Sequence, residues 1–444
     1  MTTIFALSSG HGKAGVAVIR ISGAAAGHAL RGMAGALPEA RRAALRTLRD
    51  PATGEALDRG LILWFPAPAS FTGEDMAELH IHGGRAVIEA VFRTLAAFPD
   101  LRPAEPGEFA RRAFENGKLD LTAAEGLADL IDAETEAQRR QALRQSAGEL
   151  RALYDRWRQQ LIEALASIEA ELDFSDEADV PDTVAHAACS VAIRLRAELM
   201  AHLADGRRGE ILREGLRVVI AGPPNAGKSS LMNALAQRDV AIVSAHAGTT
   251  RDIIEVRLDL GGFPVILMDT AGIREAAGEI EQEGIRRALE RAKEADHVLW
   301  LNDATCEKAA RPDTTLGGDA HGARIIEVMS KIDLAPGLPA PGSAALRLSV
   351  RTGEGMSGLI ERLTAEAEAA AGTGESVAIT RARHRRGLEQ CLAALDRFLD
   401  GNFASLELRA EDLRQAATAL GRLTGRVDVE DILDRIFADF CIGK

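Results

Sequence analysis

The chain has 444 residues, 46% of them hydrophobic, and a formal net charge of −13. The hydrophobic fraction excludes disorder throughout, and the length favours two to four domains of about 100–200 residues each. The acidic balance argues against a protein that binds nucleic acid by itself, because phosphate neutralisation dominates such binding. Four cysteines without a CxxC pair, no signal-peptide pattern and no apolar run of roughly 18 residues predict a cytoplasmic protein without a membrane span.

Short apolar segments separated by glycine and proline characterise residues 1–118. Residues 16–21, 61–65 and the alternating 76–82 predict strands, and residues 85–98 predict a helix. This mixture predicts an N-terminal α+β domain.

Helical periodicity begins near residue 119. Large apolar residues recur about every 3.7 positions from Leu150 to Leu172, which predicts one long helix with a buried face. The acidic residues 173–177 are interpreted as a solvated helix end, although a metal or partner site is the alternative. A second helix is expected over 184–203, so residues 119–214 form the first part of a helical domain.

Strands and helices alternate from residue 215 to residue 373. Strands are expected over 216–221, 265–268, 298–301 and 325–329, and helices over 229–237 and 285–293. This order predicts a mostly parallel sheet. Because a helical sequence pattern resumes over 374–444, we expect an α/β domain inserted into the helical domain.

A phosphate-binding motif follows the first of these strands. Gly222 to Ser229 reads GPPNAGKS and fits GxxxxGK[ST], which requires a strand before it and a helix after it. Lys228 is expected on the β- and γ-phosphates and Ser229 on Mg²⁺. Asp269 begins the sequence DTAG at a strand end and is expected to hold Mg²⁺ through water, while Thr250 is the candidate that completes the Mg²⁺ shell.

Guanine recognition is predicted by the sequence after the 325–329 strand. Ser330-Lys331-Ile332-Asp333 occupies the place of an NKxD motif, in which the aspartate accepts hydrogen bonds from guanine N1 and N2. Residues 349–351 lie where the backbone contacts guanine O6. Serine replaces the asparagine, and we expect it to be too short to reproduce the contacts of the amide with the base and the P-loop, which predicts weaker nucleotide binding.

The position that carries a water-orienting glutamine in Ras-like enzymes is Ile273. Isoleucine cannot orient water. Four acidic residues follow and are candidates for that role or solvated charges at a helix start: Glu275, Glu279, Glu281 and Glu283.

The chain resembles the MnmE (TrmE) family of tRNA modification GTPases along its whole length. The motifs that carry the resemblance are VIRISG at 18–23, SFTGED at 70–75, PGEF at 106–109, NGKLD at 116–120, GPPNAGKSS at 222–230, AGTTRD at 247–252, DTAG at 269–272 and the terminal FCIGK. The resemblance implies an N-terminal tetrahydrofolate-binding and dimerisation domain (1–118), a helical domain (119–214 and 374–444) and an inserted Ras-like G domain (215–373).

The resemblance also implies chemistry and partners. It predicts a K⁺-activated GTPase that acts with a separate FAD-containing protein, MnmG, in a heterotetramer or larger complex. Together they add an aminomethyl or carboxymethylaminomethyl group to C5 of the wobble uridine, U34, of certain tRNAs. The one-carbon unit comes from 5-formyl- or 5,10-methylene-tetrahydrofolate. The chain is expected to be a homodimer that meets tRNA through the complex.

Residue roles follow from the matching motif positions. GTP binding is assigned to Asn225, Ala226, Gly227, Lys228, Ser229, Ser230, Ser244, Ala245, His246, Ala247, Gly248, Thr249, Thr250, Asp269, Thr270, Ala271, Gly272, Ser330, Lys331, Asp333, Ser349, Val350 and Arg351. The K⁺ ligands are Asn225, Ser244, His246 and Thr249, and Glu281 orients the attacking water. The folate contacts are Arg20, Glu78, Lys118 and Lys444, and Cys441 is a candidate functional thiol.

The sequence is compatible with several alternatives. A ribosome-assembly GTPase would share the P-loop and DTAG motifs, but a basic RNA-binding domain should follow its G domain. A GTP-gated scaffold, with all covalent steps on MnmG, is also compatible with the sequence. Glu78, His80 and His82 share one face of a strand and are a weaker candidate for a metal site. A basic cluster follows the G domain and is a candidate for a tRNA or partner contact, or for a solvated helix face: Arg381, Arg383, His384, Arg385 and Arg386.

Overall fold

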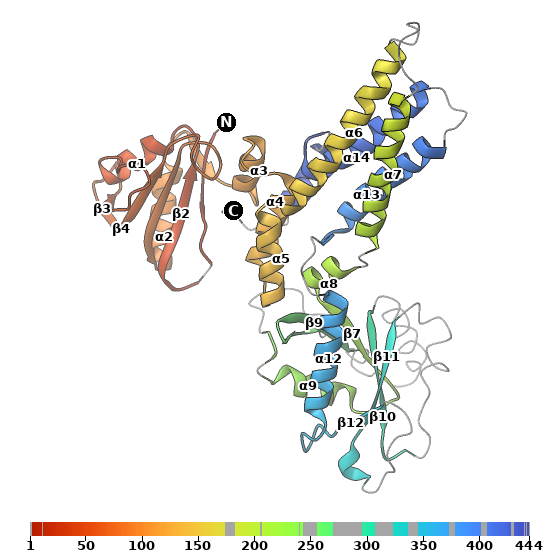
Figure 1. The fold of residues 1–444 in the computed structure, drawn as a ribbon. Helices are drawn as coiled ribbons and strands as arrows, with labels where there is room; N and C mark the ends of the chain where they lie inside the picture. The colour runs from red at the N-terminus through yellow and green to blue at the C-terminus, as the bar shows by residue number, and fades with distance from the viewer. Residues whose placement is uncertain are drawn as a thin grey trace, which may run out of the picture. The chain divides into compact units, whose positions relative to one another are not determined.

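The computed structural model describes residues 2–10, 12–173, 183–204, 207–238, 240–242, 255–269, 295–306, 323–335, 345–372, 378–400, 406–427, 430–438, 440 and 442–443 (Figure 1). The chain divides into two compact units. The first comprises Met1–Ala128, Ser146–Ile162 and Ala417–Lys444, and the second comprises Asp129–Gln145 and Glu163–Ala416.

The first unit contains a six-stranded sheet in the order β3-β4-β5-β2-β1-β6. All neighbouring strands are antiparallel except β1 and β6. The bounds are β1 Thr3–Leu7, β2 Ala14–Ser22, β3 Ala44–Arg49, β4 Ala56–Phe65, β5 Met76–Gly83 and β6 Leu101–Pro103. The strands expected over 16–21, 61–65 and 76–82 are confirmed.

Two helices cover one face of this sheet. The side chains of α1 (Ala26–Ala34) and α2 (Arg85–Ala96) share a core with the inward residues of β2, β4 and β5. Leu30, Ile19 and Leu79 in this core are fully buried. The alternation of β5 therefore directs Glu78 and His80 to the opposite face.

The remainder of the first unit brings the two ends of the chain together. Helices α3 (Glu108–Glu115) and α15 (Glu430–Ala438) pack together, and Pro106 pairs with Ile442 in an isolated bridge. Ser8 Oγ donates a 2.8 Å hydrogen bond to the carbonyl oxygen of Gly443. The residues just before the C-terminus thus lie against the first strands of the sheet.

The helical segments have the bounds α4 Leu121–Ile131, α5 Glu136–Ser146, α6 Glu149–Asp173, α7 Thr183–Leu203, α8 Arg208–Glu214, α13 Ala382–Asp400 and α14 Leu406–Thr424. The long helix expected from periodicity is confirmed as α6, and the helix expected over 184–203 is confirmed as α7. Helices α7 and α13 pack against each other within the second unit. No helix among the described residues is long and apolar enough to cross a membrane.

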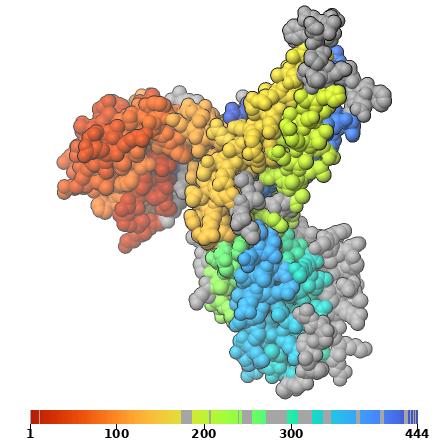
Figure 2. Space-filling model, in the orientation of Figure 1, coloured from red at the N-terminus to blue at the C-terminus, as the bar shows by residue number. Residues whose placement is uncertain are grey.

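A second six-stranded sheet, in the order β12-β11-β10-β7-β9-β8, is built from the inserted segment. Its strands are β7 Leu216–Ala221, β8 Glu255–Leu260, β9 Phe263–Asp269, β10 His297–Asp303, β11 Arg324–Ser330 and β12 Leu346–Arg347. All pairs are parallel except β8 with β9. Helices α9 (Lys228–Ala236) and α12 (Met356–Ala371) share its larger core, and α12 is visible at the surface in Figure 2.

The edge strand β8 was not predicted. Its sequence, EVRLDL, alternates charged and apolar residues, and only Leu258 and Leu260 are buried. The pattern fits an edge strand with one face on the core, but it is too short to distinguish from a loop without its partner β9.

Candidate nucleotide-binding site

The P-loop connects the end of β7 to the start of α9. Gly222 has φ 147°, and a Cβ there would lie 2.2 Å from the carbonyl oxygen of Leu301 on β10, so no larger residue fits. Lys228 Nζ donates to the carbonyl oxygens of Gly222 (3.0 Å) and Pro223 (2.9 Å), which places the ammonium over the loop. Burial lowers the pKa of Lys228, and Asp269 opposes that shift. The loop thus presents a cation and the N-terminus of α9, both of which favour phosphate.

Two oxygen ligands suited to Mg²⁺ lie side by side next to this loop. Ser229 Oγ on α9 donates to Asp269 Oδ2 at the end of β9, at 3.1 Å. Asp269 is buried. A hydroxyl and a carboxylate are hard oxygen donors of the kind that Mg²⁺ prefers, so these residues fit the ion. Thr250, the third expected contributor, lies outside the described residues.

The residues expected to read the base meet at the end of β11. Asp333 lies in the short 3₁₀ helix η1 (Ile332–Leu334), and Ser349 Oγ donates to its Oδ1 at 2.7 Å. Ser349 is fully buried, so its hydrogen bond holds that oxygen in place. Val350 is half-buried and Arg351 is exposed in the turn that follows. The Asp333 carboxylate held in this way is an acceptor of the kind that the donor edge of guanine requires.

Ser330 and Lys331 connect this region to the P-loop. Lys331 Nζ donates to the carbonyl oxygen of Asn225 and to Asp303 Oδ2, both at 2.6 Å. Ser330 Oγ lies 2.6 Å from the carbonyl oxygen of Ala226. The expectation that serine is too short to reproduce the amide's contact with the P-loop is therefore wrong: the end of β11 lies close enough to the loop for a short side chain to reach it.

Many predicted site residues lie outside the described residues. They include the expected K⁺ ligands other than Asn225, the water-orienting Glu281, one folate contact and the candidate thiol. These residues are Ser244, Ala245, His246, Ala247, Gly248, Thr249, Thr250, Thr270, Ala271, Gly272, Glu275, Glu279, Glu281, Glu283, Cys441 and Lys444.

A second polar cluster lies on the face of the first unit's sheet that is opposite α1 and α2. Arg20 on β2 and Glu78 on β5 are direct cross-strand partners. Arg20 Nε donates to Glu78 Oε1 at 3.0 Å, and His80 Nε2 lies 3.1 Å from Glu78 Oε2. Burial raises the pKa of Glu78, but hydrogen bonds and charge from His80 and Arg20 outweigh it, so the pKa lies below its ordinary value. Two of the expected folate contacts are therefore adjacent.

The loop at residues 70–75 joins this cluster to Lys118. Phe71 lies under the Arg20 guanidinium, with 5.6 Å from Cζ to the ring centroid. A Cβ placed on Gly73 would lie 3.3 Å from Lys118 Cε, so Lys118 lies against the same loop. His82 instead pairs with Asp58, at 2.8 Å between Nδ1 and Oδ1, and no metal-binding group of three His, Cys, Asp or Glu side chains occurs in the described part of the chain.

Sequence reasoning missed the buried arginine that supports this loop. Arg112, 4% exposed, pairs with Glu74 at 3.0 Å and with Glu108 at 2.9 Å, and Ser22 Oγ also donates to Glu74. Glu74 belongs to the SFTGED motif and Glu108 to the PGEF motif. The glutamates of the two motifs were the available signal in the sequence. Arg112, the cation that they share, is distant from Glu74 along the chain, so the sequence did not indicate the pairing.

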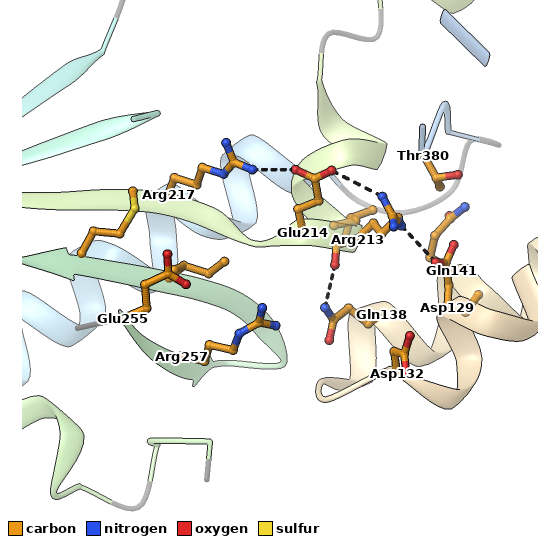
Figure 3. Close-up of a pocket in the computed structure, with 14 residues that line it drawn as sticks. Asp129, Asp132, Gln138, Gln141, Arg213, Glu214, Arg217, Glu255, Arg257 and Thr380 are labelled. Atoms are coloured by element: carbon orange, nitrogen blue, oxygen red, sulfur yellow. Dashed lines mark hydrogen bonds and ion pairs between the residues drawn. The ribbon is translucent and has the colours of Figure 1, made fainter. Parts of the chain in front are cut away.

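A further cavity of about 600 Å³ occurs in the second unit (Figure 3). Arg213 on α8 and Arg381 both pair with Asp129, at 3.0 and 2.7 Å, and Gln138 donates to the carbonyl oxygen of Arg213. Arg385 pairs with Glu210 at 3.3 Å. Two arginines of the basic cluster thus form internal ion pairs at the entry and exit of the inserted domain.

Comparison with known proteins shows to which family the chain belongs. The family model described as "GTP-binding protein TrmE N-terminus" matches residues 3–118, and the one described as "MnmE helical domain" matches residues 121–441. A "tRNA modification GTPase MnmE" of Parvibaculum lavamentivorans is 56% identical over the full length of both chains. Those of Rhodopseudomonas palustris and Maricaulis maris are each 54% identical, over 100% of this chain and 99% and 100% of theirs.

The chain belongs to the MnmE family. It is a GTPase involved in tRNA modification, and its fold comprises the TrmE N-terminal domain, the MnmE helical domain and a P-loop G domain. Membership of the MnmE family over the whole chain argues against the ribosome-assembly alternative.

Proposed function

We propose that this protein is a K⁺-activated GTPase that, with an FAD-containing MnmG partner, modifies C5 of the wobble uridine of certain tRNAs. The added aminomethyl or carboxymethylaminomethyl group takes its one-carbon unit from a tetrahydrofolate derivative. The observation that carries the GTP part is the set of contacts that ties Ser330 and Lys331 to the P-loop beside Asp333. The full-length similarity to tRNA modification GTPases supports the tRNA part.

The residues of this chain divide the work of hydrolysis. Lys228 binds the phosphates, and Ser229 with Asp269 and Thr250 would hold Mg²⁺. A K⁺ ion held by Asn225, Ser244, His246 and Thr249 would neutralise charge that develops between the β- and γ-phosphates, as an arginine does in other GTPases. Glu281 orients the attacking water, because Ile273 cannot.

The test of this mechanism is GTP turnover in KCl and in NaCl at matched ionic strength, with Mg²⁺ present in both. We expect turnover to require K⁺, since Na⁺ is too small for ligands spaced for K⁺. Glu281→Ala should retain GTP binding and lower kcat by about 10²–10⁴-fold, the usual effect of removing a positioned acid–base group. Equal rates in the two salts would overturn K⁺ activation, and a loss of affinity at unchanged kcat would make Glu281 structural.

The N-terminal domain supplies the folate and dimerisation functions in this proposal. Arg20, Glu78, Lys118 and Lys444 contact the folate, with the carboxylate on pterin ring nitrogens and the basic groups on the glutamyl tail. A homodimer forms through this domain, and the large exposed apolar side chains Val16, Leu45 and Leu61 offer surface for such a contact. Sedimentation of the purified chain measures the dimer directly.

Two measurements test the modification function. Titration of the isolated chain with 5-formyl-tetrahydrofolate should show saturable binding. Nucleoside analysis of tRNA from a strain that lacks the gene should show the loss of the C5 modification at the wobble uridine. Loss of modification without any folate binding by this chain would favour the GTP-gated scaffold, in which MnmG holds the one-carbon donor.

A further inference from the structure

Ser330 occupies the position from which an NKxD asparagine contacts the guanine base. We infer that this chain binds guanine without a protein hydrogen bond to N7, and that Ser330 is the residue responsible. The inference concerns the base specificity of the GTPase site and goes beyond the identity of the nucleotide. It depends on where the single proton of the Ser330 hydroxyl is used.

The surroundings of the hydroxyl commit that proton to the protein. Among the described residues, Ser330 Oγ has two partners, the carbonyl oxygens of Ala226 at 2.6 Å and of Asn302 at 3.1 Å. Both partners are acceptors, so the hydroxyl must donate toward them, and it has only one proton to donate. Ser330 is 3% exposed, which leaves the side chain little freedom to turn toward a ligand.

Redirecting the proton to a base would break a buried hydrogen bond. Guanine N7 is an acceptor, so it requires a donor. If Ser330 donated to N7, the Ala226 carbonyl would lose its short bond from Ser330, and an unsatisfied buried acceptor costs more than an ordinary hydrogen bond gains. The exchange is therefore unfavourable.

The neighbouring side chains do not replace the missing donor. Lys331 Nζ uses two of its three N–H donors on the Asn225 carbonyl oxygen and on Asp303 Oδ2, and these two acceptors hold the ammonium against the P-loop. When ionised, the Asp333 carboxylate has acceptors and no donor. It can therefore accept from the donor edge of guanine but cannot donate to N7. An asparagine at 330 would differ, because its amide has two N–H donors and can serve a P-loop carbonyl and N7 together.

The experiment compares GDP with 7-deaza-GDP, in which a C–H replaces N7 without a change of size. Competition titrations against fluorescent GDP give the two dissociation constants for wild type, Ser330→Asn and Ser330→Ala. We expect wild type to bind the two nucleotides equally. Ser330→Asn should prefer GDP by roughly threefold to tenfold, the equivalent of one neutral hydrogen bond. Ser330→Ala should weaken both equally, because it removes the contact to the P-loop and no contact to the base.

Inosine diphosphate, which lacks the N2 amino group, serves as the control for the Asp333 side of the base. All three proteins should bind it more weakly than GDP by the same factor. A threefold or larger preference of wild type for GDP over 7-deaza-GDP would overturn the inference, since another donor or a bound water would then read N7. Because the wild-type ratio decides this by itself, a variant that fails to fold does not remove the test. Failure of wild type to bind GDP at all would instead contradict the guanine-nucleotide assignment.

Discussion

Two carboxylates in this protein, Asp333 in the G domain and Glu78 in the N-terminal domain, are both expected to read the donor edge of a ligand ring, but their surroundings differ. Within the described part of the chain, Asp333 accepts one side-chain hydrogen bond, from Ser349 on Oδ1. Glu78 is engaged on both oxygens, by Arg20 on Oε1 and His80 on Oε2. Asp333 therefore has acceptor capacity to spare, whereas Glu78 must share or exchange partners to bind a pterin.

This difference shows that a motif residue does not make a binding site by itself. The supporting contacts determine whether its polar atoms are available. At Asp333 the supporting contact is the hydroxyl of the buried Ser349. At Glu78 it comes from the same strand and the neighbouring strand, on the face where a ligand would bind. We expect mutations to separate the two cases by the size of their effects.

The largest effect is expected for Asp333→Asn. The variant loses two hydrogen bonds to a charged acceptor, each worth about 1.5–3 kcal/mol, so GTP affinity should fall by roughly 10²–10⁴-fold. Xanthosine triphosphate, which offers a carbonyl in place of the N2 amino group, should gain affinity. The measurement is a titration with both nucleotides.

Asp303→Asn is the matched control for this prediction. It makes the same chemical change near the site but alters a partner of Lys331 instead of a base contact. It should weaken both nucleotides less and leave their ratio unchanged. If Asp333→Asn gains no affinity for xanthosine triphosphate, Asp333 does not read the base and does not differ from Glu78 in the way described.

A smaller effect is expected for Glu78→Gln on folate binding. One charge-assisted hydrogen bond is removed, which should weaken 5-formyl-tetrahydrofolate binding by roughly 10–100-fold. Asp58→Asn removes the carboxylate of the other His pair on this sheet, with His82, and should leave folate affinity unchanged. Equal losses in both variants would show that Glu78 acts only through the stability of the sheet.

The smallest effect is the pH dependence that the Glu78 pair adds to stability. The pKa of Glu78 in the folded protein lies below its ordinary value of 4.5, so its contribution is fully present above about pH 4.5 and is lost as the pH falls through the folded-state pKa. Urea unfolding of wild type and Glu78→Gln at pH 6 and pH 4 measures it. Wild type should lose more stability than the variant over this interval, and identical losses would mean that the pairing with Arg20 and His80 leaves stability unaffected.

The sequence alone determined the features that depend on short spacing. The GPPNAGKS motif predicts a strand before it and a helix after it, and β7 and α9 are found there. The period of the apolar residues between Leu150 and Leu172 predicted α6. These features could be read because their residues are neighbours along the chain, where hydrogen-bonding geometry links sequence period to structure.

Only the tertiary structure decided which polar atoms meet across long separations. Ser330 contacts Ala226 over 104 residues of chain, and this contact reversed the expectation drawn from the length of the serine side chain. Arg112 joins Glu74 and Glu108, and β8 becomes a strand by pairing with β9. In each case the distance between two backbone segments, set by packing of the sheet and its helices, determines whether a side chain reaches its partner, and no local pattern encodes that distance.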